Sequence, residues 1–479
     1  MESIYKKNSK NIKKGDVFFS IQGKLINGND CIQEAIENGA TKIIIQKDNL
    51  LTKNLENYII SKNLKYEYVE NIYQKFAELN KEFYQIKDTD FTILGVTGTK
   101  GKTTTANCLF LFFRKLEIST GLMSSTGHRL NEEHFHGGEK LTTEMADTIY
   151  RFLYEAKIRK INHIILEVSS HAFSQKRVFG ITFDGFIFTN FSQEHGESHP
   201  TQKDYFLAKC LLYQQVKENG IIVLNKKDKK VWGSKKYKKT NQTINYFTEN
   251  NKKEKDNYYE IINETILETE AKIIFNEKEY TFKSSWTGNY NIENIFASIL
   301  LTHKLKNLSE EEINMLLRTV VSLPSIPGRN EKYVLKNNAI VSIEKAPTPN
   351  SVSLTIKRLK QFTNNLIAIF GCGGDRDKKK RPLLGKIIET YADTIYVTTD
   401  NPRFENIDSI FQDIARGFNF SKNIFFIHNR EEAIKLAIEQ STKETIIALI
   451  GKGDETYQDI NGQKYPFSEK KIIAEYIAI

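Results

Sequence analysis

Cysteine is scarce in this chain. Among 479 residues there are only four cysteines, Cys31, Cys108, Cys210 and Cys372. None stands near another in the spacing of metal ligands, and the four do not suggest a disulfide framework. This usage predicts a cytoplasmic protein.

Long hydrophobic runs are also missing. The longest apolar candidate, Leu109 to Phe113, stops at Arg114 and is far shorter than the ~20 residues that span a bilayer. The N-terminal residues are basic, but no apolar segment of the kind found in secretion signals follows them. We therefore expect neither a membrane partner nor a signal peptide.

Proline is absent from the first 199 residues, and all eight prolines lie at or after Pro200. Pro324 and Pro327 bracket the sequence PSIPGR, which indicates a stiff linker and a domain boundary. A second boundary is expected near residues 88–90, where a helical pattern gives way to the apolar run FTILGV. Because the chain is too long for a single core, we expect three domains, at 1–89, 90–324 and 325–479.

Acidic residues are in the minority, and the net charge is +10. A basic balance favours an anionic partner, either a polyphosphate substrate or nucleic acid, unless it reflects only a solvated lysine-rich surface. The densest basic segment, residues 225–240, carries eight lysines but lacks the interleaved aromatics of a base-stacking platform. We expect small anionic substrates rather than nucleic acid, and a monomeric protein.

What the chain does contain is an alternation of apolar runs with helical patterns. In the middle segment the runs are FTILGVTG, INHIILEVSSH, GFIFTNFSQEH and GIIVLNKKD, and the last segment repeats the pattern in NLIAIFGCGGDRD, TIYVTTDNPR, NIFFIHN and TIIALIGKGDE. Such alternation predicts parallel sheets covered by helices, with ligands beyond the carboxyl ends of the strands. The predicted fold class is α/β in three domains: a small N-terminal α/β domain, a central domain with a parallel sheet, and a C-terminal open-sheet, Rossmann-like domain. The loop described next makes the central domain a P-loop ATPase domain.

The segment GVTGTKGKTT, Gly95 to Thr104, resembles a phosphate-binding loop but misses the usual spacing, because Val96 stands where the first glycine belongs. Its setting of strand, loop and helix nevertheless favours phosphate binding, since Gly98 and Gly101 let backbone N–H groups turn toward an anion. In this interpretation Lys102 bridges the β- and γ-phosphates of ATP and Thr103 offers a hydroxyl to Mg²⁺. The alternative is a glycine-rich turn with a surface lysine.

Three further residues follow the apolar runs of the middle segment. Glu167 ends one run, where a bare carboxylate is costly and calls for a nearby cation. His195 lies in the turn after the next run, and Lys209 lies on the apolar face of a helix. Lys209 is either a snorkelling side chain or a desolvated amine open to modification. Together with the loop, these residues indicate a metal–nucleotide site.

Nine motifs follow one another along the chain: GVTGTKGKTT, LEVSSH, TNFSQEH, YFLAK, TGNYNIEN, PGRNE, GCGGDRDKKKRP, TDNPR and GKGDETYQ. In this combination the chain resembles the Mur ligases, most closely the MurE type, over nearly its whole length. The family's loop reads Gly-x-Thr-Gly-Thr-Asn-Gly-Lys-Thr, with the first glycine one place early, so the unusual spacing is a family trait. The resemblance implies that ATP phosphorylates the D-Glu side-chain carboxylate of UDP-MurNAc-L-Ala-D-Glu, and that a diamino acid then attacks the acyl phosphate.

The resemblance also implies roles for individual residues. The ATP set is Gly98, Thr99, Lys100, Gly101, Lys102, Thr103, Thr104, Asn294 near adenine, Arg329 at the phosphates and Glu344 at the ribose. Thr103 and Glu167 would hold one Mg²⁺, and His195 with a carbamylated Lys209 would hold a second. The UDP-MurNAc-dipeptide set is Ser9, Thr142, Thr143, Ser169, Gln175 and Arg177. The set for meso-diaminopimelate is Arg381, Asp400, Asn401, Arg403, Gly451 and Glu455.

Several positions depart from the family pattern. The segment EKAPTP, at residues 344–349, has Lys345 in place of an aromatic and Pro347 in place of histidine. Asp454 stands where histidine is usual, and Glu144 stands where proline is common. The alternatives that remain open are a ligase that adds lysine or ornithine, a MurF-type or folylpolyglutamate-type ligase, and a nucleic-acid-stimulated P-loop ATPase.

Overall fold

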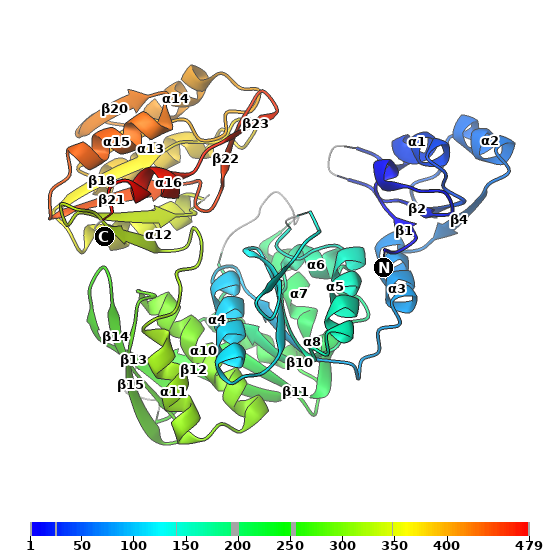
Figure 1. Cartoon of the computed structure of the whole chain (residues 1–479), viewed down its shortest axis with the longest axis horizontal. Helices are drawn as coiled ribbons and strands as arrows, with labels where there is room; N and C mark the ends of the chain where they lie inside the picture. The colour runs from blue at the N-terminus through cyan, green and yellow to red at the C-terminus, as the bar shows by residue number, and fades with distance from the viewer. Residues whose placement is uncertain are drawn as a thin grey trace. The chain divides into compact units, whose positions relative to one another are not determined.

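The structure is a computed structural model that describes residues 2–23, 26–139, 141–192, 201–250, 255–346 and 348–477. The chain divides into two compact units. The first comprises Met1–Glu260, Lys272–Thr281 and Asn289–Arg318, and the second comprises Ile261–Ala271, Phe282–Gly288 and Thr319–Ile479. Figure 1 labels the elements along the chain.

The first unit begins with a small α/β layer pair, as the sequence predicts. Four parallel strands lie in the order β1 (Tyr5–Lys6), β2 (Val17–Ser20), β3 (Lys42–Gln46) and β4 (Lys65–Val69). The helices of this part are α1 (Ile32–Glu37), α2 (Lys53–Ser61) and α3 (Ile72–Phe83). Phe18 and Ile43 from the sheet pack with Ile32 of α1 and Ile59 of α2 to form its core.

The centre of the first unit is a sheet whose middle strands run parallel. Their order is β11 (Val216–Asn225), β10 (Phe183–Phe188), β5 (Thr92–Thr97), β9 (His163–Glu167) and β6 (Thr120–Ser124). β5 is buried almost along its whole length, as expected of a strand with helices on both faces. Because these strands are parallel, the residues that follow β5, β9 and β10 meet at one edge of the sheet.

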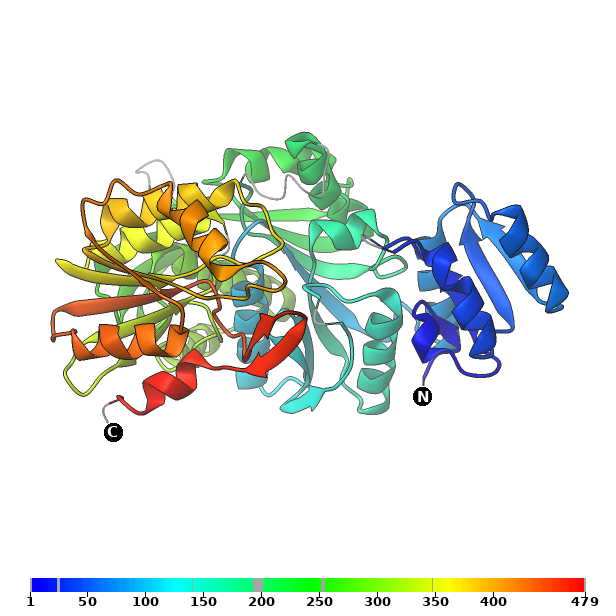
Figure 2. The ribbon, with the colours of Figure 1, turned by 90° about the horizontal axis from the view of Figure 1, so that it is seen from above.

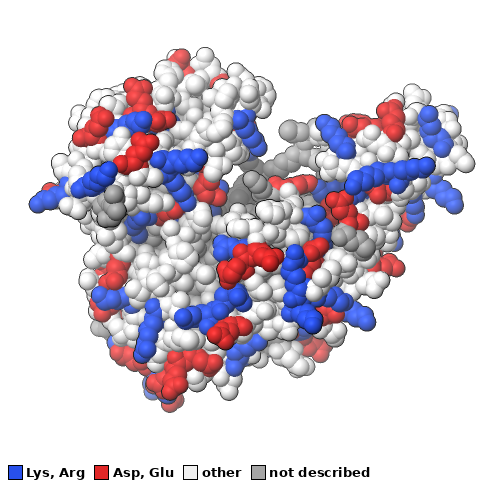
Figure 3. Space-filling view, viewed as in Figure 1, with Lys and Arg blue, Asp and Glu red and all other residues white. Residues whose placement is uncertain are grey.

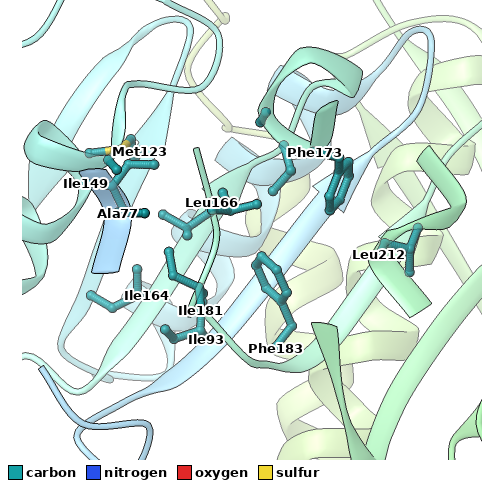
Figure 4. Packing of buried hydrophobic residues seen from close by; sticks show 14 of the residues in the cluster. Ala77, Ile93, Met123, Ile149, Ile164, Leu166, Phe173, Ile181, Phe183 and Leu212 are labelled. Atoms are coloured by element: carbon teal, nitrogen blue, oxygen red, sulfur yellow. The ribbon is translucent and has the colours of Figure 1, made fainter. Parts of the chain in front are cut away.

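Helices surround this parallel centre. They are α4 (Lys102–Lys115), α5 (Ala146–Ile158), α6 (Ser170–Ser174), α7 (Gln202–Cys210), α8 (Leu212–Gln215), α9 (Lys229–Gly233), α10 (Asn289–Lys306) and α11 (Glu310–Val320). Figure 4 shows Ile93, Leu166 and Phe183 from three of the strands gathered with Phe173 in one apolar cluster. The core therefore fixes the strand ends that carry the predicted site.

Further strands extend the sheet at both sides, which the sequence did not predict. β7 (Gly127–Leu130) and β8 (Glu133–Phe135) follow β6 as antiparallel strands. On the other side the sheet continues through β12 (Thr243–Glu249), β13 (Tyr258–Glu264), β14 (Thr269–Phe275) and β15 (Lys278–Ser284), giving eleven strands among the described residues. β12 is parallel to β11, and β13 is parallel to β12.

The second unit holds a six-stranded sheet. Its order is β16 (Glu331–Val334), β17 (Ile340–Glu344), β21 (Thr445–Ile450), β18 (Asn365–Phe370), β19 (Thr394–Thr398) and β20 (Asn423–Ile427), and only β16 is antiparallel to its neighbour. A hairpin of β22 (Tyr457–Ile460) and β23 (Gln463–Pro466) follows β21.

Helices lie on both faces of this second sheet (Figures 1 and 2). One face carries α12 (Pro349–Lys360), α13 (Lys380–Tyr391) and α14 (Ile407–Ala415), and the other carries α15 (Arg430–Glu439) and α16 (Glu469–Ala474). Alternate residues of β18 serve the two faces, since Ala368 packs with the first group and Ile367 and Ile369 with the second. The predicted α/β class with an open last sheet is confirmed.

Candidate active site

The predicted phosphate loop joins β5 to the first turn of α4. Gly98 has φ +151° and Gly101 has φ +79°, in the region that favours glycine. A Cβ atom at Gly98 would lie 1.9 Å from Thr189 Oγ1, and one at Gly101 would lie 2.5 Å from Asn294 Oδ1. Close neighbours therefore require both glycines, and the loop leads into the N-terminus of a fourteen-residue helix, which favours anions.

The earlier glycine of the motif has a different task. Gly95 lies inside β5, and a Cβ there would approach Phe186 Cε2 to 2.3 Å. Gly95 therefore packs the strand against a ring of β10 and takes no part in the loop. This explains why the spacing of the motif departs from the usual template.

Residues after β10 hold the loop in place. Thr189 Oγ1 and Asn190 Nδ2 donate to the carbonyl of Lys100 at 2.6 and 3.0 Å, and Lys100 N donates to Asn190 Oδ1 at 2.9 Å. The Lys102 ammonium donates to the carbonyls of Gly98 and Thr99 at 3.1 and 3.0 Å. Thr103 and Thr104, also in the predicted ATP set, lie in the first turn of α4 and are buried. The loop is thus preformed, with its lysine folded over it.

Glu167 lies beside the loop and is only 2% exposed. Thr103 Oγ1 donates to its Oε1 at 3.0 Å, while Ser125 donates to its Oε2 from both the backbone N, at 2.9 Å, and Oγ, at 2.7 Å. Sequence reasoning missed Ser125, although it directly follows β6 and could have been found as a polar residue at the carboxyl edge of the sheet. The three side chains present hydroxyl and carboxylate oxygens to one place.

Lys209 lies in the last turn of α7, in the interior. It is 1% exposed, its Nζ donates to the Gly98 carbonyl at 2.8 Å, and the same atom lies 4.7 Å from the centre of the Tyr205 ring. This burial rules out the alternative of a snorkelling side chain and places the amine against the phosphate loop. His195 lies outside the described residues, as does Pro347.

Four of the residues predicted for UDP-MurNAc-dipeptide form one network. Thr143 Oγ1 lies 3.3 Å from Ser169 Oγ and accepts from Ser169 N at 2.9 Å. Arg177 Nη1 donates to the Thr143 carbonyl at 2.6 Å, and its Nε and Nη2 donate to Gln175 Oε1 at 2.9 and 2.6 Å. Burial lowers the pKa of Arg177. Thr142 directly precedes this network and is half-buried.

Ser9, near the N-terminus, and Glu144, in the LTTE segment, both form hydrogen bonds to other protein residues. Ser9 is buried in the first sheet's layer, where its hydroxyl bonds to Glu34. Glu144, which replaces the usual proline, is fully buried and accepts from Glu139 N at 2.9 Å and Leu141 N at 3.2 Å. Glu144 therefore shapes the loop before Thr143, whereas Ser9 bonds to Glu34 and Asn38 of the N-terminal layer.

The predicted amino-acid residues of the second unit gather after β19 and β21. Asn401 Nδ2 donates to Glu455 Oε2 at 2.8 Å, and a Cβ at Gly451 would lie 3.0 Å from Asp400 Oδ2. Lys452, which sequence reasoning left without a role, has a fully buried side chain whose Nζ lies 3.1 Å from Asn401 Oδ1, 3.5 Å from Glu455 and 3.6 Å from Asp400. Its charge compensates the two carboxylates and fixes both loops.

Arg403 stands at the same edge with its side chain about a quarter exposed. Its Nη1 donates to the Gly374 carbonyl at 2.6 Å, and its Nε is 3.9 Å from Asp459 Oδ2. Arg403 has φ +51°, a strained conformation for a residue with a side chain. The Asp459 contact is long, so the guanidinium retains capacity for a ligand.

Arg381 does not belong with these residues. Its side chain is fully buried in α13, where Nη1 and Nη2 donate to Glu405 at 2.8 and 2.7 Å and Nη1 also donates to Asp413 at 2.9 Å. The bonds to Arg381 hold the pKa of Glu405 well below its usual range. This placement argues against the prediction that Arg381 contacts the amino acid. The side chain of Arg376, five residues before Arg381, is by contrast exposed. A Cβ atom added to Gly373 would lie 3.6 Å from its Cγ atom.

The remaining ATP predictions fall in both units. Asn294 of α10 is buried, and its Oδ1 accepts a hydrogen bond from Thr105 Oγ1 at 3.1 Å. Because the same side chain lies next to Gly101, it packs against the phosphate loop. Arg329 Nη1 donates to the Lys345 carbonyl at 3.0 Å. Glu344 ends β17, and burial raises the pKa of its carboxyl.

The lysine-rich segment does contain aromatic residues, contrary to the interpretation from sequence. Lys235 Nζ lies 3.9 Å and Lys226 Nζ 5.5 Å from the centre of the Trp232 ring, and Lys236 Nζ lies 5.1 Å from that of Tyr237. Ammonium groups cover these rings, which are therefore poor platforms for bases. Figure 3 shows acidic and basic side chains interspersed over one face of the molecule.

Comparison with known proteins assigns the class. Three family models match: the Mur ligase middle domain over residues 96–302, the Mur ligase glutamate ligase domain over 328–453, and the Mur ligase family catalytic domain over 4–83. The chain belongs to the Mur ligase family and is an ATP-dependent ligase. No helix in the described parts of the chain has the length and apolarity that a membrane crossing requires.

Individual relatives show which members of the family the chain is similar to. The chain is 32% identical to the UDP-N-acetylmuramoyl-L-alanyl-D-glutamate–2,6-diaminopimelate ligase of Aquifex aeolicus, covering 98% of this chain and 92% of the relative. It is also 32% identical to the enzyme of the same name from Fusobacterium nucleatum, covering 97% and 92%. A solved structure of a ligase of that name superposes with a TM-score of 0.66 at 25% identity, covering 98% of this chain and 93% of the other.

Proposed function

We propose that this ligase adds meso-diaminopimelate to the D-Glu residue of UDP-MurNAc-L-Ala-D-Glu, at the expense of ATP, in the synthesis of peptidoglycan precursors. The observation that carries the proposal is the buried Glu167 carboxylate, held by Thr103 and Ser125 directly beside a preformed phosphate loop. The names of the relatives that match almost the entire chain support the choice of substrates.

The chemistry requires activation of a carboxylate, which is a poor electrophile. Its oxygen attacks the γ-phosphorus of ATP, ADP leaves, and the amine of the incoming amino acid then attacks the carbonyl carbon of the acyl phosphate. Phosphate departs with the former carboxylate oxygen. Lys102 and the N–H groups of the loop screen the charges that meet in the first step.

The residues beside the loop fit Mg²⁺. Thr103, Ser125 and Glu167 supply only oxygen donors, which suit this hard cation. Among the described residues, no three or more His, Cys, Asp or Glu side chains are grouped so that they alone could hold a metal ion. Bound Mg²⁺ would neutralise phosphate charge and orient the γ-phosphate. Lys209, as a carbamate, and His195 would hold a second ion, and burial of Lys209 against Gly98 supports its part in this proposal.

The two other substrates are assigned to the networks described above. The dipeptide nucleotide would be bound by Ser9, Thr142, Thr143, Ser169, Gln175 and Arg177. Asp400, Asn401, Gly451 and Glu455 would hold the amino and carboxyl groups of the amino acid. Arg403 would pair with the distal carboxylate, which diaminopimelate has and lysine or ornithine lacks.

The same proposal extends to the organisation of the chain. We assign domains to residues 1–89, 90–324 and 325–479, with Asn294, Arg329 and Glu344 contributing to ATP binding. The protein would act as a monomer in the cytoplasm, where its nucleotide substrates are made.

One assay tests the function. The protein is mixed with ATP, Mg²⁺ and UDP-MurNAc-L-Ala-D-Glu, and phosphate release is measured with diaminopimelate, lysine or ornithine. We expect release with diaminopimelate, weak release with lysine and ornithine, and none without the dipeptide nucleotide. Equal use of lysine would overturn the specificity, and release that needs DNA or RNA instead would overturn the ligase.

A further inference from the structure

Two residues that depart from the family motifs contact each other. Lys345 directly follows β17 and Asp454 lies in the turn after β21, and these strands pair in parallel with Glu344 opposite Ile450. The distance from Lys345 Nζ to Asp454 Oδ1 is 2.8 Å, and the two side chains are 35% and 28% exposed. Lys345 and Asp454 therefore form one ion pair.

The backbone around this pair is tightly packed. A Cβ on Gly453 would lie 2.7 Å from Lys345 Cβ, and a Cβ on Gly328 would lie 2.6 Å from Asp454 N. Lys345 N donates to the Gly328 carbonyl at 2.9 Å, and Arg329 donates to the Lys345 carbonyl at 3.0 Å. The lysine and the aspartate are thus presented to each other by fixed main chain, which lowers the entropic cost of pairing two surface charges.

Asp454 is also next to the proposed amino-acid site. It directly precedes Glu455, which accepts from Asn401 at 2.8 Å. Glu455 and Asp400 already share the single buried charge of Lys452. An unpaired Asp454 would add a third carboxylate here, and such a field would disfavour a ligand with a distal carboxylate and favour a cationic side chain.

We propose that the Lys345–Asp454 ion pair is a specificity device: Lys345 cancels the charge of Asp454 and so preserves the preference for diaminopimelate over lysine. This inference rests on the proposed function. At an effective dielectric constant between those of protein and water, one uncompensated unit charge within about one Debye length of a ligand carboxylate changes binding by roughly 3- to 10-fold.

The test compares kcat/KM for diaminopimelate with kcat/KM for lysine, together with KM for ATP. Lys345→Met should lower the diaminopimelate-to-lysine ratio roughly 3- to 10-fold, and less at high salt. Asp454→Asn, which leaves Lys345 unpaired, should raise the ratio. The double variant should return close to wild type. Lys360→Met is the matched control, because Lys360 forms a 2.6 Å pair with Asp393 at 30% and 31% exposure in the same unit, outside the proposed site.

Each result decides the matter. An unchanged ratio in both single variants overturns the inference, as does a change confined to KM for ATP or a double variant no closer to wild type than Lys345→Met. If Lys345→Met does not fold, the rise expected for Asp454→Asn still tests the claim. Failure of the proposed function has a different signature, namely a wild-type protein that releases no phosphate in response to any of the amino acids.

Discussion

Substitution of Lys209 tests whether this lysine is only a structural hydrogen-bond donor or is chemically modified. The side chain is 1% exposed and its amine donates to the Gly98 carbonyl at 2.8 Å. If the amine were only a hydrogen-bond donor, Lys209→Met would keep the volume and lose one charged bond, about 1.5–3 kcal/mol of stability. If the amine takes up CO₂ to become a carbamate, with release of a proton, the variant also loses a carboxylate-like ligand for Mg²⁺.

The second case predicts a loss of about 10²- to 10³-fold in kcat, the range found when one group that stabilises transition-state charge is removed. Acetate or formate should restore part of the activity, because a small carboxylate can enter the space of the missing one. Wild-type activity should fall in CO₂-depleted buffer and recover with bicarbonate. Steady-state phosphate release measures all three effects.

Lys102→Met is the matched control, since Lys102 also donates to the Gly98 carbonyl, at 3.1 Å. It should lose activity without any rescue by small carboxylates. The reasoning is refuted if Lys209→Met keeps activity within about threefold of wild type, or if acetate rescues the two variants equally.

Three further outcomes are expected. Arg403→Ala should raise KM for diaminopimelate about 10- to 100-fold, the equivalent of ~1.5–3 kcal/mol, with little change in KM for ATP, and equal changes in both would refute its role. Gly95→Ala should destabilise the protein by ~1–3 kcal/mol in urea unfolding, because its Cβ would meet Phe186 at 2.3 Å, whereas Gly233→Ala, with nothing within 4 Å, should not. Burial lowers the pKa of His163 to about 4 from 6.5, so the unfolded chain binds the extra proton between those values and stability rises with pH there. His163→Gln should flatten this rise by ~1–2 kcal/mol, after allowance for partial exposure, and an unaltered pH profile would contradict it.

The sequence was most informative where local pattern decides structure. The strands β5, β9 and β10 are continuous apolar runs that end in polar turns, so their parallel arrangement and the meeting of Glu167 with the phosphate loop could be predicted. The strands β12 to β15 were missed. In β14 and β15 buried residues alternate with more exposed ones, and such strands depend on their neighbours for their place.

Side-chain direction was the weakest part of the prediction. A motif gives the order and type of residues, but not whether a helix turns a given arginine inward, as α13 does with Arg381. Lys452 and Ser125 were overlooked for a related reason, since each acquires a role only through partners distant in sequence. The pairing of Lys345 with Asp454 likewise became visible only when β17 and β21 were adjacent.

The central claim is ligation through an acyl phosphate, and oxygen transfer tests it most directly. UDP-MurNAc-L-Ala-D-Glu labelled with ¹⁸O in the D-Glu side-chain carboxylate is converted with ATP, Mg²⁺ and diaminopimelate, and mass spectrometry follows the label. The account predicts one ¹⁸O atom in each phosphate released, with a tripeptide product formed in equal amount. Unlabelled phosphate, or labelled phosphate without an amide product, would contradict it.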